Sequence, residues 1–153
     1  MTRDELARAI VELPGFDAER RGMTLKFTDA ASGGSAWEIT VCDDTAKAVH
    51  EIVTESTYDG EPITEWWPDL TDAATGGCLL ALLGESIRHV RQVSGHRALR
   101  ERLRTTHGRV CCDGWVIEYV TGAVGMPKAD GATLGEACAR VALALGRWPG
   151  GGS

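Results

Sequence analysis

Seven arginines gather between residues 88 and 109 of this chain, together with three of its four histidines and a single acid, Glu101. The arginines are Arg88, Arg91, Arg97, Arg100, Arg102, Arg104 and Arg109. The whole protein has a formal net charge of −6. The segment carries +6, so the other residues together carry a strong negative charge. Such a separation of charge creates a field that attracts partners of opposite sign.

This basic segment is the strongest candidate for a binding surface. Arg97, Arg100 and Arg104 follow the spacing i, i+3, i+7 and would share one face of a helix. We expect Arg88 and Arg91 on the polar side of the preceding helix. The candidate binding residues of the segment are Arg88, Arg91, His96, Arg97, Arg100 and Arg104.

Three interpretations of the arginines remain open. They could contact the phosphates of a nucleic acid, dock onto an acidic protein surface, or form a solvated basic face paired with acids elsewhere in the chain. A pI near 5.2 and the lack of aromatic residues among the arginines weigh against nucleic acid, because bases stack on aromatic side chains.

Trp66 and Trp67 are the second candidate binding feature. They precede Pro68 within residues 56–71, where turn signals at Asp59-Gly60 and Pro68 predict a loop. Exposed on a loop, the two tryptophans would suit a partner's hot spot. Folded back, they would cover the apolar helix around Leu79–Leu83, which is the arrangement we expect.

Catalytic motifs are missing from the sequence. There is no Walker A motif, no glycine fingerprint after a strand, no Gly-x-Ser-x-Gly elbow and no His-Glu-x-x-His. Asp43 with Asp44, and Asp69 with Asp72, could help to hold magnesium, but both pairs precede expected helices, where aspartates cap free amides. We therefore predict a protein that is not an enzyme and has no cofactor.

A metal site is predicted to be absent as well. His107, Cys111 and Cys112, with His96, are the best ligand candidates, yet the strand expected here would point the two cysteines to opposite faces, and the usual zinc spacings are absent. A metal-dependent hydrolase remains an alternative function.

The expected compartment is the bacterial cytoplasm. Five cysteines without a Cys-x-x-Cys pair are neither a disulfide framework nor a zinc ribbon. No apolar run approaches the roughly 20 residues that span a bilayer, and the first residues are acidic where a signal peptide is basic and then apolar. Cys78 and Cys138 fall among apolar helical residues, so we expect both to be buried.

Helical periodicity and capping residues predict most of the elements. Thr2 with Glu5, and Thr133 with Glu136, form capping boxes, and Asp72 begins the most apolar helix. Residues 44–55 permit a helix or a strand, and we favour the helix. The expected helices are about 2–13, 44–55, 72–93, 98–105 and 133–146.

Alternating apolar residues predict two antiparallel hairpins. The first covers about 23–42. The second covers about 108–120, because Asp113-Gly114 is a two-residue turn signal that would pair Cys112 with Trp115 and Arg109 with Glu118. We thus expect one α+β domain over residues 1–148, in which these hairpins pack with three to five helices, and a flexible tail over residues 149–153.

Two segments carry a resemblance to known proteins. The run Trp67-Pro68-Asp69-Leu70-Thr71-Asp72-Ala73-Ala74-Thr75-Gly76-Gly77-Cys78-Leu79-Leu80-Ala81-Leu82-Leu83 resembles small uncharacterised accessory proteins of phages and prophages, in which a "DPAT-x-GCLLALL"-like helix follows an aromatic-Pro stretch. Thr133–Arg140 is similar to the amphipathic helix that often closes them. The chain departs from the pattern at Ala73, where proline is expected, and throughout the arginine-rich segment.

The resemblance implies a phage accessory context and carries no catalytic residues. The leading expectation is a protein that binds a host protein or complex, with antagonism of a host defence system, as by anti-CRISPR proteins, as one form of that role. The alternative is a nucleic-acid-binding regulator that uses the basic segment. We expect no membrane partner, and the sequence leaves the oligomeric state open.

Overall fold

The computed structural model describes residues 1–30, 35–94 and 113–151. Its helices are α1 (Arg3–Val11), α2 (Ala46–Glu55), α3 (Ala73–Leu83) and α5 (Leu134–Leu145), with a 3-10 turn η1 (Gly84–Ser86). Its strands are β1 (Thr24–Asp29), β2 (Ala36–Thr40), β3 (Thr57–Tyr58), β4 (Glu61–Pro68), β5 (Ile87–Ser94), β6 (Asp113–Tyr119) and β7 (Lys128–Gly131). The fold is a single α+β domain, as the sequence predicts.

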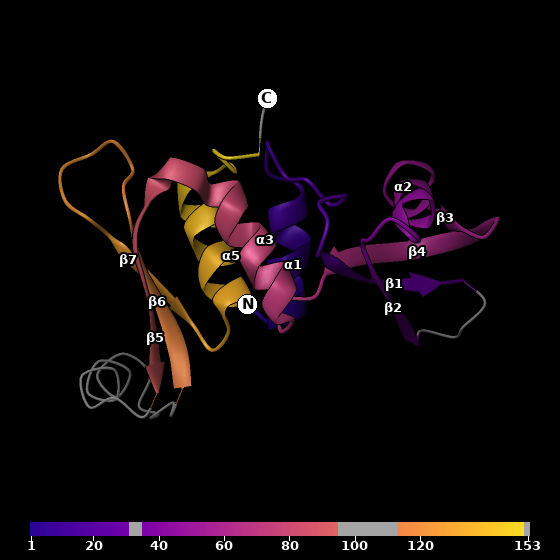
Figure 1. The fold of residues 1–153 in the computed structure, drawn as a ribbon, viewed down its shortest axis with the longest axis horizontal. Coiled ribbons are helices and arrows are strands. Elements are labelled where there is room, and N and C mark those ends of the chain that lie inside the picture. The colour runs from indigo at the N-terminus through magenta and orange to yellow at the C-terminus, as the bar shows by residue number, and fades with distance from the viewer. Residues whose placement is uncertain (31–34, 95–112, 152–153) are drawn as a thin grey trace.

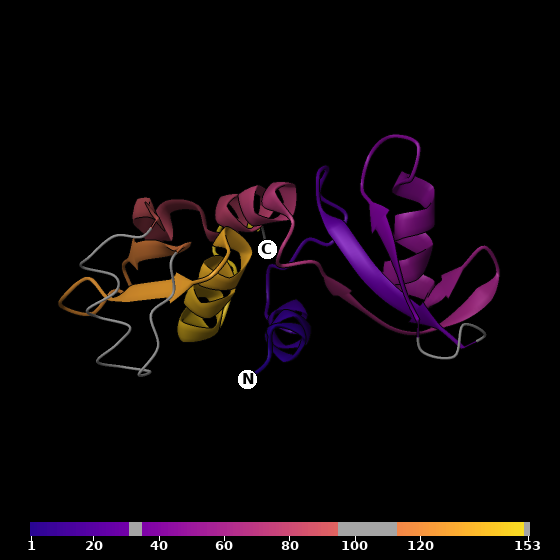
Figure 2. The ribbon, with the colours of Figure 1, turned by 90° about the horizontal axis from the view of Figure 1, so that it is seen from below.

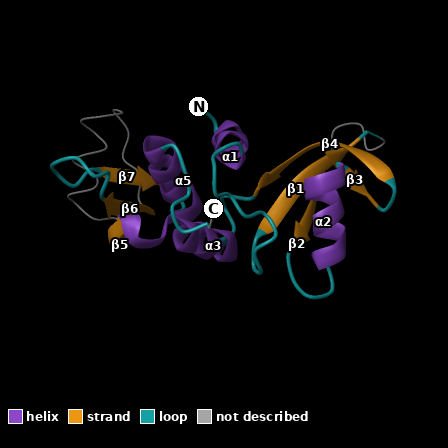
Figure 3. Cartoon of the chain, turned by 90° about the horizontal axis from the view of Figure 1, so that it is seen from above, coloured by secondary structure: helices purple, strands orange, loops and turns teal. Residues whose placement is uncertain are grey.

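Helices α1, α3 and α5 form the middle of the molecule and a sheet lies at each end (Figure 1). The first sheet has the order β2-β1-β4-β3, and α2 covers one of its faces (Figure 3). The second sheet has the order β5-β6-β7, and α5 packs against β6 and β7. Between them, α1 contacts both α5 and β4, so it joins the two halves.

The predicted first hairpin is confirmed. Strands β1 and β2 pair antiparallel, with Leu25 opposite Ile39 and Phe27 opposite Trp37. Phe27 is buried against Ile52 of α2. The apolar side chains that alternate along β1 therefore lie on the face of the sheet that α2 covers.

Three predicted helix starts are confirmed by their caps. Thr2 Oγ1 accepts a hydrogen bond from the Glu5 amide at 3.1 Å, and the Glu5 carboxylate accepts one from the Thr2 amide at 3.2 Å. Asp72 and Thr133 cap α3 and α5, because their side chains accept hydrogen bonds from the amides of Thr75 and Glu136. Residues 46–55 are the helix α2, which settles the helix-or-strand alternative for that segment.

The predicted helix over 72–93 is wrong beyond Leu83. Gly84 takes a backbone conformation (φ 57°, ψ −131°) that a helix cannot contain, and glycine adopts it without a Cβ penalty. After η1 the chain enters β5, in which Ile87 and Val90 are still the core-facing residues. A bulge between Ile87 and His89 adds one residue to β5, so Ile87 and Val90 lie on the same face of the strand although they are three positions apart. That spacing is also the spacing of residues on one face of a helix.

The predicted turn at Asp113-Gly114 is also wrong. Both residues lie inside β6, where Asp113 pairs with Ser94 and Gly114 with Val93. Trp115, which was expected opposite Cys112, instead pairs with Gln92 of β5 and Gly131 of β7. A two-residue turn signal is local, and here the pairing of β6 with two other strands overrides it. Residues 109–112 and the expected helix 98–105 lie outside the described residues.

Residues 56–71 contain strands rather than the predicted loop. Only the turn signal Asp59-Gly60 is confirmed, since it connects β3 to β4 with φ of 53° and 82°. Glu65 to Pro68 of β4 then pair with β1. Trp66 and Trp67 are therefore strand residues.

The main core joins α1, α3 and α5 with one end of each sheet. Its largest fully buried side chains include Trp148, which follows α5. The next residues are packed as well, because Gly150 donates its amide hydrogen to the carbonyl oxygen of Leu82 at 2.6 Å. Part of the segment expected to be a flexible tail is thus held against α3. No helix in the described part of the chain is long and apolar enough to cross a membrane.

Candidate binding surfaces

Strand β5 belongs to the sheet at one end of the molecule (Figure 2), and it carries two arginines and a histidine. Ile87 and Val90 pack against the core, while Arg88, His89 and Arg91 are exposed. Among the described strands, β5 pairs only with β6 and is an edge of its sheet. We call Arg88, His89 and Arg91, with the edge of β5 that pairs with no described strand, the β5 surface.

Arg88 sits at the bulge and is held by the preceding turn. The register opposes Ile87 to Tyr119 and His89 to Glu118, so Arg88 is the extra residue. Its Nη1 donates a hydrogen bond to the carbonyl oxygen of Glu85 at 2.7 Å. Bulges often redirect a side chain, and here the hydrogen bond fixes part of the guanidinium and leaves the rest exposed.

Arg91 and His89 are less constrained. Arg91 lies opposite Val116 in the sheet, and none of the described acids forms an ion pair with it. His89 lies opposite Glu118, whose carboxylate is 3.4 Å from Lys128 Nζ of β7. Of the two arginines on β5, Arg91 is therefore the one that the described residues hold less.

The prediction that Arg88 and Arg91 lie on the polar side of a helix is wrong, because both lie on β5. The apolar residues of β5 have the spacing of a helix, so sequence periodicity alone could not show that Arg88 and Arg91 lie on a strand. The other four candidate residues of the segment are His96, Arg97, Arg100 and Arg104, and they lie outside the described residues.

Trp66 and Trp67 point to opposite faces of β4. Trp67 is 5% exposed and belongs to the core that contains Leu79, so it is a covering residue and does not form an exposed hot spot. The guanidinium carbon of Arg8 lies 4.6 Å from the centre of its ring, an arrangement that favours a cation–π interaction.

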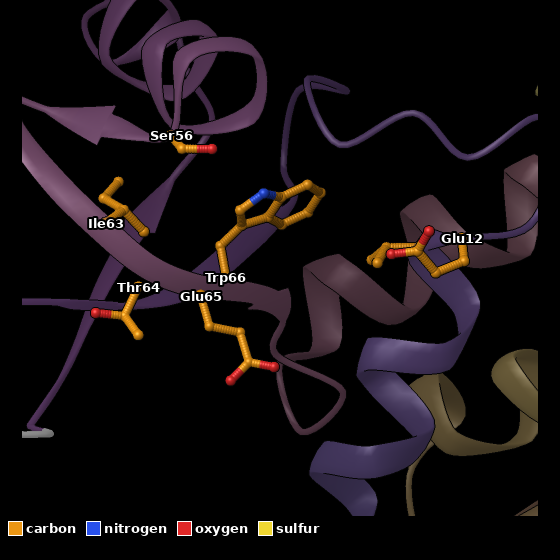
Figure 4. Close-up of a pocket in the computed structure, with 7 residues that line it drawn as sticks. Glu12, Ser56, Ile63, Thr64, Glu65 and Trp66 are labelled. Carbon is orange, nitrogen blue, oxygen red and sulfur yellow. The ribbon is translucent and has the colours of Figure 1, made fainter.

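Trp66 instead lines a hollow that the sequence analysis missed. The hollow has a volume of about 250 Å³ and lies where the end of α1 approaches β4 (Figure 4). Its lining residues are Val11, Glu12, Ser56, Ile63, Thr64, Glu65 and Trp66. Glu12 and Trp66 are 54 positions apart in sequence, so no local pattern could have indicated that they share a site.

The acid pairs have structural roles. Asp72 caps α3, and Asp69 Oδ1 accepts hydrogen bonds from the amide and hydroxyl of Thr71 at 3.0 and 2.6 Å. Asp43 does not cap α2 and instead pairs with Arg21 at 3.1 Å. Within the described residues, no three metal-ligating side chains are grouped so that they could hold an ion.

The described cysteines differ in environment. Cys78 and Cys138 are buried, as predicted. Burial raises the pKa of the Cys138 thiol to about 12 and also raises the pKa of Cys78. Cys42 is exposed. Its pKa is lowered, chiefly by the hydrogen bond between its thiol and the Thr45 side chain and then by backbone amides at Thr45 and Asp44.

Comparisons with protein-family models, with curated proteins and with solved structures find no match for this chain. The functional assignment therefore depends on the residues described above.

Proposed function

We propose that this protein acts by binding a partner protein through the β5 surface, as a phage- or prophage-type accessory protein directed at a host protein or complex. The observation that carries the proposal is the exposure of Arg88, His89 and Arg91 along an edge strand. An edge strand offers backbone N–H and C=O groups to an added strand. The cationic side chains select an acidic segment as that strand.

The remaining features support the same role. The chain is acidic overall, at −6, so the cationic β5 surface differs in charge from most of the protein and can orient an approaching partner. The phage context comes from the resemblance of residues 67–83. Antagonism of a host defence system is one form that such binding takes.

Nucleic-acid binding through the same arginines is the second candidate function. It is favoured by the two exposed guanidinium groups of Arg88 and Arg91 on one strand, since arginine is a frequent contact to phosphate oxygens. The first candidate accounts better for the edge of β5 that pairs with no described strand, because a nucleic acid would leave its backbone groups unused.

The test is capture of bound proteins from bacterial extract on the tagged chain, with and without nuclease, followed by mass spectrometry. We expect a stoichiometric protein that survives nuclease and is lost with Arg91→Glu. Lys47→Glu is the matched control, because it makes the same charge change at an exposed position of α2, in the other sheet's layer. Partners that disappear with nuclease would favour the nucleic-acid function instead.

A further inference from the structure

The hollow beside Trp66 has the composition of a site for a positive charge. Figure 4 shows Glu12 at the end of α1, across the gap from the indole of Trp66, while Glu65 projects from β4 at the rim. Pockets for drug-sized ligands measure about 300–1,000 Å³, so a hollow of about 250 Å³ suits a group the size of one side chain.

A β-bulge forms one wall of the hollow. Thr28 of β1 lies opposite Glu65, and Asp29 lies opposite Ile63, so Thr64 has no partner in β1. The extra residue bends β4 where it approaches α1, and bulges are over-represented next to functional sites for this reason.

The indole of Trp66 is held in place before any ligand arrives. It stacks on Phe16 with ring centres 6.4 Å apart and planes at 25°, and Phe16 in turn contacts the buried Trp148 at 5.9 Å. Because the Trp66 ring is already ordered, binding of a ligand costs less side-chain conformational entropy.

The carboxylate of Glu12 is exposed at the end of α1. Glu12 is the C-cap residue of α1, and the last carbonyl groups of a helix create partial negative charge that disfavours a carboxylate there. Among the described residues, Arg8 pairs with Glu65 at 2.6 Å, and no cation pairs with Glu12. A bound cation would relieve this repulsion.

We propose that the hollow between Glu12 and Trp66 binds a guanidinium or primary ammonium group. Tryptophan is the best aromatic partner for a cation, and arginine is the commoner cation at such sites. The carboxylate of Glu12 supplies a charge-assisted hydrogen-bond acceptor. The site goes beyond the proposed function, because it lies between α1 and β4, away from β5, and takes a ligand of opposite charge. The cation comes either from a basic protein segment or from a free amine.

The test is a titration of the full ¹⁵N-labelled chain with Nα-acetyl-arginine amide, observed by NMR at the Trp66 indole N–H. Nα-acetyl-citrulline amide, which has the same shape without the charge, is the control probe. We expect a saturable shift with the arginine probe only. Equal shifts with both probes, or no shift with either, would overturn the proposal.

Two variants test the role of the carboxylate. Glu12→Gln should raise the Kd for the arginine probe at least fivefold without lowering the Tm, because it removes an unfavourable charge from the end of α1. Glu85→Gln, an exposed acid of η1, should leave the Kd unchanged. An unchanged Kd in Glu12→Gln would show that the carboxylate does not bind the probe and would contradict the site.

Two further ligands identify the source of the cation. A short arginine-containing peptide that binds more tightly than the single arginine amide would assign the site to a basic protein segment. A diamine such as 1,4-diaminobutane that binds more tightly than the peptide would assign it to a free amine. Either result supports the cation site itself.

Discussion

Trp148 donates its indole Nε1 hydrogen to the carbonyl oxygen of Ile10 across 3.0 Å, and this bond ties the segment after α5 to the end of α1. Ile10 is in the last turn of α1, where carbonyl groups lack their usual helical partners. Trp148 is only 2% exposed. The same indole also contacts Phe16, on which Trp66 stacks, so the C-terminal segment supports the wall of the hollow.

Replacing Trp148 should therefore destabilise the whole domain. Trp148→Phe keeps an aromatic ring but removes this hydrogen bond, while the Ile10 carbonyl still accepts one from the Leu13 amide at 3.3 Å. We therefore expect a loss of about 0.5–1.5 kcal/mol in the free energy of unfolding. Urea denaturation measures the loss. Trp37→Phe, at a position of β2 that is 54% exposed, should have an effect close to zero. Equal effects at the two positions would show that the Trp148 contact adds nothing.

Two helical glycines should respond to alanine in opposite directions. A Cβ at Gly135 of α5 would lie 2.5 Å from the carbonyl oxygen of Leu70, so Gly135→Ala must push two backbone segments apart. We expect a cost of about 1–3 kcal/mol, as for other overpacked sites. A Cβ at Gly77 of α3 meets nothing within 4 Å, and Gly77→Ala should stabilise the helix by about 0.5–1 kcal/mol. Thermal unfolding of the two variants checks both signs, and a fall in Tm for Gly77→Ala would contradict the second.

The contrast between these glycines explains how much of the fold the sequence could predict. The caps at Thr2, Asp72 and Thr133 depend on residues three positions apart, so sequence alone is sufficient to place three helix starts. The close approach of Gly135 to Leu70 depends on tertiary packing. Gly135 and Leu70 are far apart in the sequence, so no local pattern could indicate that they are in contact.

The same reasoning explains the errors at β5 and β6. Ile87 and Val90 follow an apolar helix at helical spacing, and only the bulge after Ile87 makes that spacing compatible with a strand. Asp113-Gly114 has the sequence of a turn, yet Gly114 pairs in the sheet with Val93, which is distant in the sequence. Local patterns could not reveal the candidate site between Glu12 and Trp66 for the same reason, because its two sides come from distant elements.

Cys42 should be the most reactive of the three described cysteines. It is exposed, and hydrogen bonding to Thr45 and to nearby amides lowers its pKa from the ordinary value of 9.0, so a larger share of thiolate is present at neutral pH. We expect iodoacetamide to modify Cys42 well before Cys78 or Cys138, as read by mass spectrometry of the native chain.

The role of Thr45 in this reactivity can be tested directly. Thr45 Oγ1 lies 3.4 Å from Cys42 Sγ, so Thr45→Val should shift the pH profile of alkylation at Cys42 to higher pH. Thr54→Val is the control in the same helix, because Thr54 bonds only to the carbonyl of His50 among the described residues. A profile that moves equally in both variants would exclude the hydrogen bond as the cause.

Cys138 should make the domain less stable in alkali. Its pKa is about 12 in the native state, against 9.0 ordinarily, because burial between α3 and α5 disfavours the thiolate. Above pH 9 the unfolded chain loses this proton while the native chain keeps it, so the native state binds more protons and its stability falls as pH rises.

The expected loss from this thiol is about 2 kcal/mol between pH 9 and pH 10.5. Urea denaturation at a series of pH values should therefore give a steeper alkaline decline for the parent chain than for Cys138→Ala. Residues that titrate in both chains, such as lysines and tyrosines, contribute equally and cancel in the difference. If the two chains declined in parallel, Cys138 would not be held in its protonated form by burial, and the packing of α3 against α5 would have to admit water.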